Sequence, residues 1–490
     1  MHAHAPPALI AAGLFVATLA TRIPFMSDQL WAWDSVLYAR ALEDGFHVDY
    51  VAANQRPHPP GYLLYVAAAA VVRQITADSN SALVIISMIA SALAVAALFL
   101  FSRRFASDRA AAFVSVGFAL SPLVWHYSEV AYPYTLLGLL SIVLAASFAA
   151  AHGRGTTAAL IASGAFGLIA GFRQDLLMII APLWIWLVWP IGWRGRAASA
   201  GMVSLGILTW LVPSMVLSGG ALPYFSALFR QTDFVRATYS VLAQGLPALG
   251  TNLGTTLYAV SWGIGLFAVP VLALAAAGAY RAVRRGRAAI GAREAFLILW
   301  IAPALLFYIA LHIGEWGYAL SVLPGLYIFA AMAIDRVQPT AKAGRGVFFA
   351  ASLVVPAVLF TVSPAPFSAA AIDVHDWALA ARVAYVREHY LAKSTLLLAR
   401  EDFLLVRYYL PEYRTWFHDP EPFRSTLRRK RAPNVNAIVV FTPGLKATST
   451  EALRVRCAKD VELVYLAIEP GAVVELHDDR YTIAESVTRR

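Results

Sequence analysis

Residues 81–102 read SALVIISMIASALAVAALFLFS, a run of 22 residues without a charged side chain. At 1.5 Å per residue, a helix of this length spans about 33 Å, enough to cross the roughly 30 Å hydrocarbon core of a bilayer. A backbone in lipid must satisfy its own hydrogen bonds, and a helix does so within a single segment. This run therefore predicts a transmembrane helix.

The rest of the chain repeats this pattern. Of its 490 residues, 59% are hydrophobic and only 14% are charged, and the mean hydropathy is +0.63. A soluble protein of this size cannot bury so much apolar surface, so the sequence predicts an α-helical polytopic membrane protein. About eleven apolar stretches are expected to cross the membrane, the first as a retained anchor because no basic segment precedes it. They lie near 8–25, 81–102, 110–126, 133–151, 156–171, 176–192, 197–217, 254–280, 294–311, 319–334 and 346–363.

The loops between these stretches differ in charge. One set of alternate loops holds fourteen Lys and Arg residues, whereas the other, longer set holds six. Lys and Arg in short loops stay on the cytoplasmic side, so we expect a multi-pass protein of the cell inner (plasma) membrane with a cytoplasmic N-terminus and a periplasmic or extracellular C-terminal region. The net charge of +10 then reflects topology and gives no reason to expect nucleic-acid binding.

Two domains are expected, a transmembrane domain at 1–363 and a periplasmic domain at 364–490. The long outer loop near 26–80 and the segment near 218–253 mix apolar and polar residues at helical spacing, which predicts helices lying on the membrane surface; the second segment is alternatively a lid. After 364, charges return and short β-rich runs alternate with helical stretches, so this part predicts a small soluble α/β domain. The lone Cys457 excludes an intramolecular disulfide.

Ionisable residues gather at the outer ends of the predicted helices. No Asp, Glu, Lys or Arg lies in the middle of a predicted span, which disfavours an ion-coupled transporter. A carboxylate in a partly dry cleft can act as general base on an acceptor or hold a divalent metal, and Arg and His can bind a departing phosphate. This set favours transfer of a group from a phosphate-bearing lipid. Its members are Asp34, Arg56, His58, Glu129, Arg173, Asp175 and Glu315.

The residues of the first loop also have structural interpretations. Asp34 is a candidate N-cap for the helix that follows it. Arg56 is a candidate contact for lipid headgroups, and His58, between two prolines, is a candidate turn residue. The sequence leaves these alternatives open.

The same holds for the later loops. Glu129 is a candidate for a helix-end role beside the fourth span. Arg173 and Asp175 are candidates for a solvated turn pair, and Glu315 for an ordinary interface anchor.

With these residues the chain resembles the GT-C superfamily of polytopic glycosyltransferases, in particular the bacterial branch related to protein O-mannosyltransferases and the lipid A aminoarabinose transferase. The likeness covers about 8–335. It rests on an Asp after the first span, a His-Pro-Pro-aromatic stretch ending the first loop, a short acidic-aromatic second loop and a late Gly-Tyr-Pro element. The matching residues are Asp34, His58, Pro59, Pro60, Gly61, Tyr62, Glu129, Tyr132, Pro133, Tyr134, Gly317, Tyr318 and Pro324.

The resemblance implies a role for each matched position. Asp34 would be the catalytic or metal-positioning carboxylate. The candidate cofactor is then a divalent cation, Mg²⁺ or Mn²⁺, held by Asp34. The sequence itself requires no cofactor. Glu129 would be the second acid. In some members this acid directly precedes Pro-aromatic, where Tyr132 stands here, but on a helix the two positions would share a face. His58 would approach the donor phosphate. The chemistry of the outer loops adds Arg56 and Arg173 as candidates that bind donor phosphate or lipid, and Tyr62, Tyr132, Tyr134, Glu315 and Tyr318 are the candidates that bind substrate.

The expected function is a membrane glycosyltransferase. It would move a hexose or pentose from a polyprenyl-phosphate donor to an extracytoplasmic lipid, glycan or protein and invert the anomeric centre, with no nucleic acid involved. This requires Asp34, His58 and Glu129 to converge on one hollow on the outer side. The alternatives are a lipid or solute transporter or flippase using the same cavity, and a scaffold or sensor that displays the C-terminal domain.

Overall fold

The computed structural model describes residues 6–50, 57, 59–285, 290–311, 313–336, 342–417, 430–441, 452–477 and 480–484. The chain divides into two compact units. The helical unit comprises Met1–Ser27 and Tyr38–Ile372. The C-terminal unit comprises Asp28–Leu37 and Asp373–Arg490.

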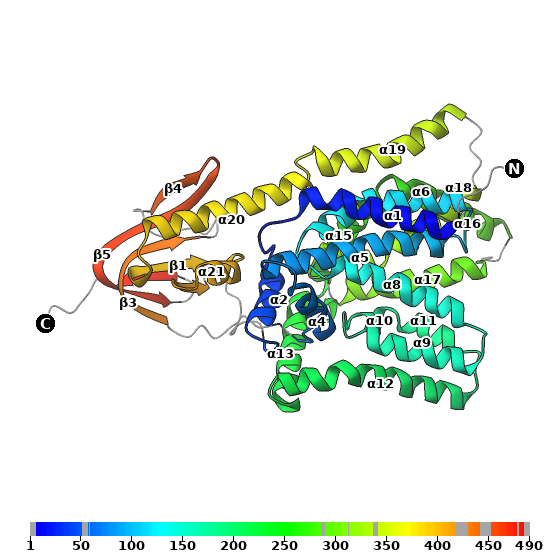
Figure 1. Cartoon of the computed structure of the whole chain (residues 1–490), viewed down its shortest axis with the longest axis horizontal. Helices are drawn as coiled ribbons and strands as arrows, with labels where there is room; N and C mark the ends of the chain where they lie inside the picture. Colours follow the sequence, from blue (N-terminus) through cyan, green and yellow to red (C-terminus); the bar gives the residue numbers. More distant parts are fainter. Residues whose placement is uncertain are drawn as a thin grey trace. The chain divides into compact units, whose positions relative to one another are not determined.

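The helical unit consists of helices joined mostly by short loops (Figure 1). Its first part contains α1 (Pro7–Arg22), η1 (Ile23–Phe25), α2 (Trp33–Glu43, from Tyr38 onward), α4 (Leu63–Val72), α5 (Ser79–Ser102), α6 (Asp108–Leu120), α7 (Pro122–Glu129), α8 (Tyr134–Ala151), α9 (Thr156–Ile169), α10 (Leu176–Ile179) and α11 (Ala181–Val188). Its second part contains α12 (Trp193–Leu217), α13 (Ala221–Tyr239), α14 (Val241–Gln244), α15 (Leu246–Ile264), η2 (Gly265–Phe267), α16 (Ala268–Arg285), α17 (Ala292–Ala310), η3 (Trp316–Ser321), α18 (Leu323–Arg336) and α19 (Lys342–Thr361).

Several of these helices are long and apolar enough to cross a bilayer, which confirms the predicted polytopic helical membrane fold. Within the described residues there are six such segments, or seven if the pair α6 and α7, bent by 55°, counts as one. The six are Pro7–Phe25, Ser79–Ser102, Tyr134–Ala151, Trp193–Leu217, Leu246–Arg281 and Ala292–Ala310.

The eleven predicted spans all coincide with helices, but these helices are unequal in length. The stretch 156–171 forms α9, which has only 14 residues, and 176–192 is broken between α10 and α11. Proline explains part of this, because Pro122 opens α7 and Pro182 lies in the first turn of α11, where neither continues the preceding helix. By length and composition alone, six or seven segments of the described residues qualify as crossings, and the expected number of about eleven stays approximate.

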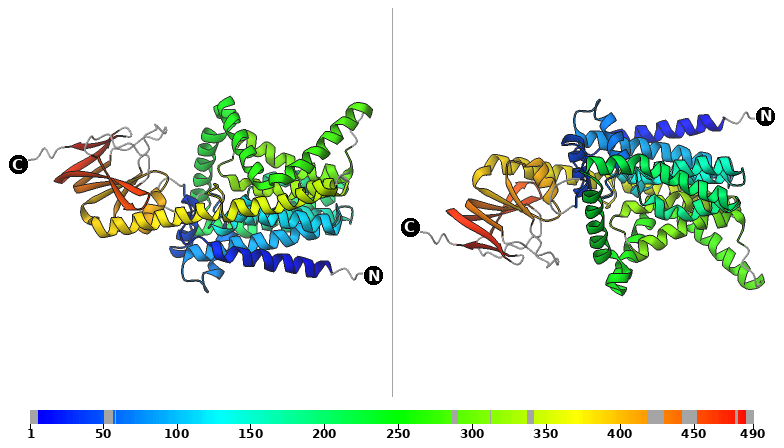
Figure 2. Two further views of the ribbon diagram at one scale, coloured as in Figure 1. Left: turned by 90° about the horizontal axis from the view of Figure 1, so that it is seen from above. Right: turned by 90° about the horizontal axis from the view of Figure 1, so that it is seen from below.

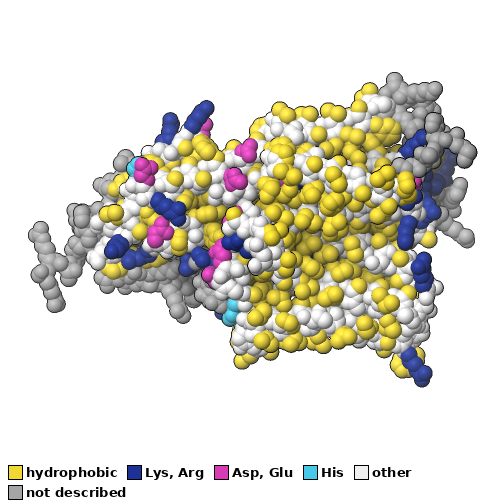
Figure 3. Space-filling view, viewed as in Figure 1, with side chains coloured by type: hydrophobic (Ala, Val, Ile, Leu, Met, Phe, Trp, Pro, Cys, Tyr) yellow, Lys and Arg dark blue, Asp and Glu magenta, His cyan; other side chains and the backbone are white. Residues whose placement is uncertain are grey.

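The centre of the helical unit is formed by α5 and α8. In each of these helices, 67% of an 18-residue apolar stretch is buried inside the protein, compared with 17% for the corresponding stretches of α1 and α12. Figure 3 shows the hydrophobic side chains of this unit as a broad exposed band, with Lys and Arg gathered at one end of it. A surface of this kind suits contact with lipid chains, since water would not solvate it favourably.

One helix lies across the ends of the others. In Figures 1 and 2, α13 runs across the ends of the long bundle helices rather than along them. Its sequence is amphipathic, and Leu222 and Phe229 are exposed while Tyr224 and Ala227 are buried. This is the geometry expected of the predicted surface helix within 218–253.

The C-terminal unit contains a mixed sheet packed with helices. Helix α20 (Ala369–His389), which enters this unit at Asp373, precedes β1 (Thr395–Ala399), α21 (Phe403–Tyr409), β2 (Arg414–Phe417), β3 (Lys430–Val440), β4 (Ala452–Ala458), β5 (Val461–His477) and β6 (Arg480–Ala484). The strand order is β2-β1-β3-β5-β4, with β6 also paired to β5. Strand β1 is parallel to both its neighbours and fully buried, whereas the β5 pairings are antiparallel. The predicted small α/β domain is thus present.

Candidate functional site

A buried arginine forms the centre of the best-defined polar site in the helical unit. Arg173 lies in the loop between α9 and α10, and its side chain is only 2% exposed. Its Nε donates to Asp175 Oδ1 at 3.2 Å and its Nη2 to Oδ2 at 2.9 Å. The pair is therefore a buried two-point ion pair and not the solvated turn pair that the sequence left open.

Three tyrosine rings enclose the Arg173 guanidinium. Its carbon lies 4.9 Å from the ring centre of Tyr62, 4.8 Å from that of Tyr134 and 5.2 Å from that of Tyr318. These are cation–π distances, and the low local dielectric strengthens them. Burial is the largest single effect and opposes the charge, but Asp175, Tyr62, Tyr318 and Tyr134 together outweigh it, and the pKa of Arg173 is raised well above its usual range.

Further aromatic and acidic side chains extend this group. Tyr127 and Tyr132 each lie with their rings 5.1 Å from that of Tyr134. The Tyr127 hydroxyl donates to Glu315 Oε2 at 3.3 Å, and Glu315 is partly exposed. We call these eight residues the Arg173–tyrosine cluster: Tyr62, Tyr127, Tyr132, Tyr134, Arg173, Asp175, Glu315 and Tyr318.

The chain fold explains why remote residues meet here. Helix α8 begins at Tyr134 and α9 ends just before Arg173, so the two ends meet because the helices are consecutive and joined at their other ends by the short loop around Arg154. The Leu64 N–H donates to the Gly171 carbonyl at 3.1 Å, which ties the start of α4, and with it Tyr62, to the Arg173 loop.

Two glycines are required by this packing. A Cβ on Gly317 would overlap the Tyr134 ring, so only glycine lets η3 bring Tyr318 to the cluster. Gly61 has φ +90° and is followed by Tyr62 at φ +50°, a left-handed pair of residues that precedes α4. A Cβ on Gly61 would also meet Val48 and Phe46. The glycines of the two family-like motifs thus have a steric role.

Glu129 belongs to a second buried group. It ends α7, and its Oε1 lies 4.0 Å from Arg22 Nε, with both side chains 0% exposed. Arg22 also donates from Nη2 to the Ala119 carbonyl at 2.6 Å and lies 4.5 Å above the Trp125 ring. Trp125 and Glu129 are four residues apart and share a face of α7.

The Arg22–Glu129 pair is polar but incompletely bonded. Among the described residues, neither carboxylate oxygen of Glu129 has a hydrogen-bond partner, and the same is true of Arg22 Nε. A buried carboxylate in this state is unusual, because desolvation is not repaid by hydrogen bonds. The role of Glu129 as the second acid stays a prediction.

One sequence expectation about Glu129 is wrong. Glu129 and Tyr132 were expected to share a helix face, but α7 ends at Glu129 and Tyr132 lies in the loop before α8. Pro133 explains the break, since it is the residue before the first turn of α8 and disfavours a helical conformation at the residue preceding it.

The predicted roles of Asp34, Arg56 and His58 stay predictions. Asp34 is on the first turn of α2, within the segment Asp28–Leu37 that belongs to the C-terminal unit. Arg56 and His58 fall outside the described residues. The predicted convergence of Asp34, His58 and Glu129 therefore stays a prediction.

Two residues of these groups were not among the predicted site residues. Arg22 falls inside the predicted first span, so it counted with neither set of loops; an arginine at the outer end of an apolar run is the signal that points to it. Tyr127 lies in the same HYSEVAYPY stretch as Glu129, and the signal that points to it is the gathering of three tyrosines, Tyr127, Tyr132 and Tyr134, within eight residues.

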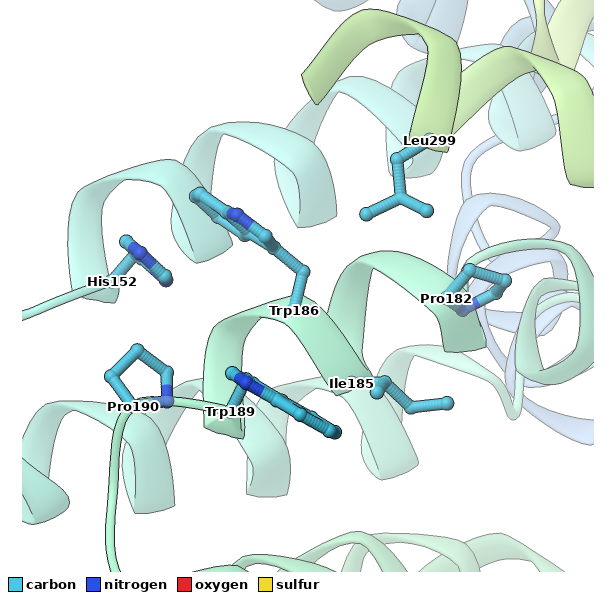
Figure 4. Close-up of a pocket in the computed structure, with 7 residues that line it drawn as sticks. All are labelled: His152, Pro182, Ile185, Trp186, Trp189, Pro190 and Leu299. Atoms are coloured by element: carbon cyan, nitrogen blue, oxygen red, sulfur yellow. The ribbon is translucent and has the colours of Figure 1, made fainter. Parts of the chain in front are cut away.

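A pocket is present at the other end of α8 (Figure 4). It has a volume of about 510 Å³ and is lined by His152, Pro182, Ile185, Trp186, Trp189, Pro190 and Leu299. His152 follows α8, whose 18 residues span about 27 Å, so this pocket lies far from the cluster at Tyr134. Its lining is apolar and contains no carboxylate, which does not suit group transfer.

Metal ligands are sparse. Across the described ranges no three His, Cys, Asp or Glu residues come together in a way that would hold a metal ion. The described side chains alone thus do not form a metal site, and the cation implied for Asp34 stays a prediction.

Comparison with solved structures gives strong matches over nearly the whole chain. ArnT from Cupriavidus metallidurans bound to undecaprenyl phosphate matches with a TM-score of 0.59 and 14% identity, covering 94% of this chain and 97% of that one. The same protein in the apo state matches with a TM-score of 0.54 and 14% identity, covering 94% and 98%. The chain has a GT-C-like fold.

The similarity behind this GT-C-like fold is structural. The archaeal oligosaccharyltransferase AglB from Archaeoglobus fulgidus, in complex with an inhibitory peptide and a dolichol-phosphate, matches with a TM-score of 0.45 and 12% identity, covering 84% of this chain and 64% of that one. This TM-score is too low to support an inference. No protein-family model matches the chain, and no curated protein matches it in sequence. The resemblance stated from the motifs is confirmed at the level of fold.

Proposed function

We propose that this chain is a membrane glycosyltransferase that transfers a sugar from a polyprenyl-phosphate-linked donor to an extracytoplasmic lipid, glycan or protein. The observation that carries the proposal is the match, over 94% of the chain, to ArnT bound to undecaprenyl phosphate. The family-like motifs around Asp34, Tyr62, Tyr134 and Tyr318 support it, because they occur in the order and loops expected for that fold.

The proposed reaction is a direct displacement. The Asp34 carboxylate accepts the proton of the acceptor hydroxyl as the acceptor oxygen forms a bond to the anomeric carbon. The bond between that carbon and the phosphate oxygen breaks, and its electron pair leaves with the polyprenyl phosphate. One displacement inverts the anomeric centre. No step uses a metal ion.

Binding of the donor is assigned to the first loop. Arg56 and His58 are proposed to bind the departing phosphate, whose growing charge they stabilise. Arg173 was a third candidate, but its guanidinium is buried, bonded to Asp175 and enclosed by rings. We therefore propose that Arg173 positions the tyrosines, while Glu315 and Tyr318, both partly exposed, contact the sugar or acceptor.

The proposed orientation places the cluster outside the cytoplasm. Arg154 lies in the loop after α8, Arg194 and Arg196 lie in the first turn of α12, and the cluster lies at the opposite end of α8. Arginine-rich short loops stay in the cytoplasm, so the N-terminus is proposed to be cytoplasmic, the C-terminal unit periplasmic and the protein resident in the inner membrane.

The experiment compares two carboxylates of the same loop. Asp34→Asn and Asp44→Asn are purified and supplied with a polyprenyl-phosphate sugar and candidate acceptors in bilayers. Asp44 directly follows α2 and is exposed, so it serves as the matched control. Asp34→Asn is expected to lower turnover about 100- to 10,000-fold, and Asp44→Asn to leave it unchanged. Equal turnover of wild type and a folded Asp34→Asn variant would remove Asp34 from the mechanism.

A further inference from the structure

The segment that carries Asp34 folds with the C-terminal domain. Residues Asp28–Leu37 follow the first membrane helix in sequence, yet they belong to the same compact unit as Asp373–Arg490. Asp34 lies within this segment, on the first turn of α2. What holds the segment to the C-terminal domain therefore determines where this carboxylate lies.

Hydrogen bonds between described residues join the segment to the domain. The Asp28 N–H donates to Asp376 Oδ2 at 2.6 Å, and the Leu30 N–H donates to the Tyr409 hydroxyl at 2.8 Å. The indole N–H of Trp33 donates to the Glu401 carbonyl. Two of these donors are main-chain groups, so the contacts fix the backbone path just before α2.

Aromatic contacts surround these hydrogen bonds. The Trp31 and His375 ring centres are 4.4 Å apart, and the Trp33 ring lies 6.3 Å from that of Phe403 and 6.0 Å from that of Phe417. Leu30, which directly precedes Trp31, is fully buried. Trp33 immediately precedes Asp34, so the residue next to the carboxylate is held by both a hydrogen bond and two rings.

The domain side of the contact is itself well ordered. Asp376 uses its second oxygen, Oδ1, against His375 Nδ1 at 3.1 Å, which leaves Oδ2 directed at the Asp28 N–H. The contacting residues come from α20, α21, β2 and the loop before α21, so one small domain supplies all of them.

We propose that the C-terminal domain is a positioning part of the active site, in which Asp376, Glu401 and Tyr409 clamp the segment Asp28–Leu37 and so hold Asp34 in place for the reaction. This inference rests on the proposed function. It assigns the soluble domain a task at the membrane reaction, whereas a free-standing scaffold domain would need no contact with the first loop. Asp376 and Tyr409 act through the segment and do not contact substrate.

The test uses two tyrosines of the same domain. Tyr409→Phe removes the hydroxyl that accepts from Leu30, whereas Tyr413→Phe removes a hydroxyl that donates to the Val386 and Tyr390 carbonyls inside the domain. Hydrogen–deuterium exchange of the full-length protein reports on the segment, and transfer from a polyprenyl-phosphate sugar reports on Asp34. Asp376→Ala provides a second break in the clamp, and Asp376→Asn keeps an acceptor oxygen for the Asp28 N–H.

The expected result is selective. Tyr409→Phe and Asp376→Ala speed exchange across 28–37 and lower kcat about tenfold with KM for the donor little changed, because the carboxylate is displaced while donor binding is retained. Tyr413→Phe leaves both unchanged, and Asp376→Asn recovers most of the activity.

Two results would overturn the inference. Faster exchange with unchanged kcat would show that the clamp exists but does not serve Asp34. Rapid exchange of 28–37 in an active wild-type protein would show that the clamp is absent. A wild type with slow exchange but no sugar transfer would instead overturn the proposed function, and the positioning role with it.

Discussion

The helical unit buries two arginine–carboxylate pairs in very different ways. Arg173 makes two hydrogen bonds to Asp175 and is enclosed by three tyrosine rings. Arg22 lies 4.0 Å from Glu129, whose carboxylate oxygens have no hydrogen-bond partner among the described residues. A fully bonded pair offsets the desolvation of both charges, whereas a buried carboxylate without hydrogen bonds has only its attraction to the arginine to offset its desolvation.

The largest expected effect comes from breaking the bonded pair. Arg173→Ala leaves Asp175 without its cation in a mostly buried site, and removes the charge that the tyrosines surround. The free energy of unfolding is expected to fall by about 3–5 kcal/mol, measured as denaturant unfolding in detergent.

The matched control for Arg173→Ala is Arg230→Ala. Arg230 is exposed on α13 and lies 4.6 Å from the Tyr50 ring centre, so it makes the same kind of ring contact without burial. Its loss is expected to cost about 0.5–1 kcal/mol. Equal losses for the two variants would show that the Arg173–tyrosine cluster is not held by its ion pair.

The Arg22–Glu129 pair is tested through its effect on activity. Glu129→Gln removes the carboxylate proposed as the second acid, and turnover is expected to fall about 100-fold, or about 2.7 kcal/mol in the barrier. Because the variant also leaves the buried Arg22 guanidinium without its anion, turnover is measured per folded molecule.

Glu388→Gln serves as the control for this variant, since Glu388 is an exposed glutamate on α20. It should alter neither turnover nor unfolding. A large loss of stability in Glu129→Gln with activity per folded molecule retained would make the Arg22–Glu129 pair structural.

The smallest expected effect lies at the edge of the cluster. Tyr127→Phe removes the hydroxyl that donates to Glu315 but keeps the ring against Tyr134. The expected loss is about 1 kcal/mol in the free energy of unfolding. Tyr280→Phe, at an exposed position on α16, should change nothing, and an equal effect of both would remove the hydrogen bond from the account.

Much of the cluster was predictable because its members lie at the ends of successive apolar runs. Tyr62, Tyr132, Tyr134, Arg173, Glu315 and Tyr318 were singled out from different loops, and the structure places all six together. Alternating loop charge sorts these loops to one side, so their proximity follows from topology alone. Their roles in binding stay predictions.

The pairing of charges was not predictable in the same way. Hydropathy averages over a whole helix, so Arg22 reads as the end of an apolar run although it is the partner of Glu129. Nor does any local pattern show that Asp28–Leu37 folds with residues more than 300 positions later, because such contacts depend on tertiary packing. The division of the chain near 363 likewise does not reveal that the first loop contributes to the C-terminal unit.

The most direct test follows the sugar and the lipid together. Wild-type protein is reconstituted in liposomes containing a polyprenyl phosphate that carries a labelled sugar, and acceptor fractions from the cell envelope are supplied. The account predicts that label appears in a new glycosidic bond of inverted configuration, with an equal amount of free polyprenyl phosphate. Labelled lipid that crosses the bilayer with its sugar still attached, and no new glycosidic bond, would contradict it and favour a transporter.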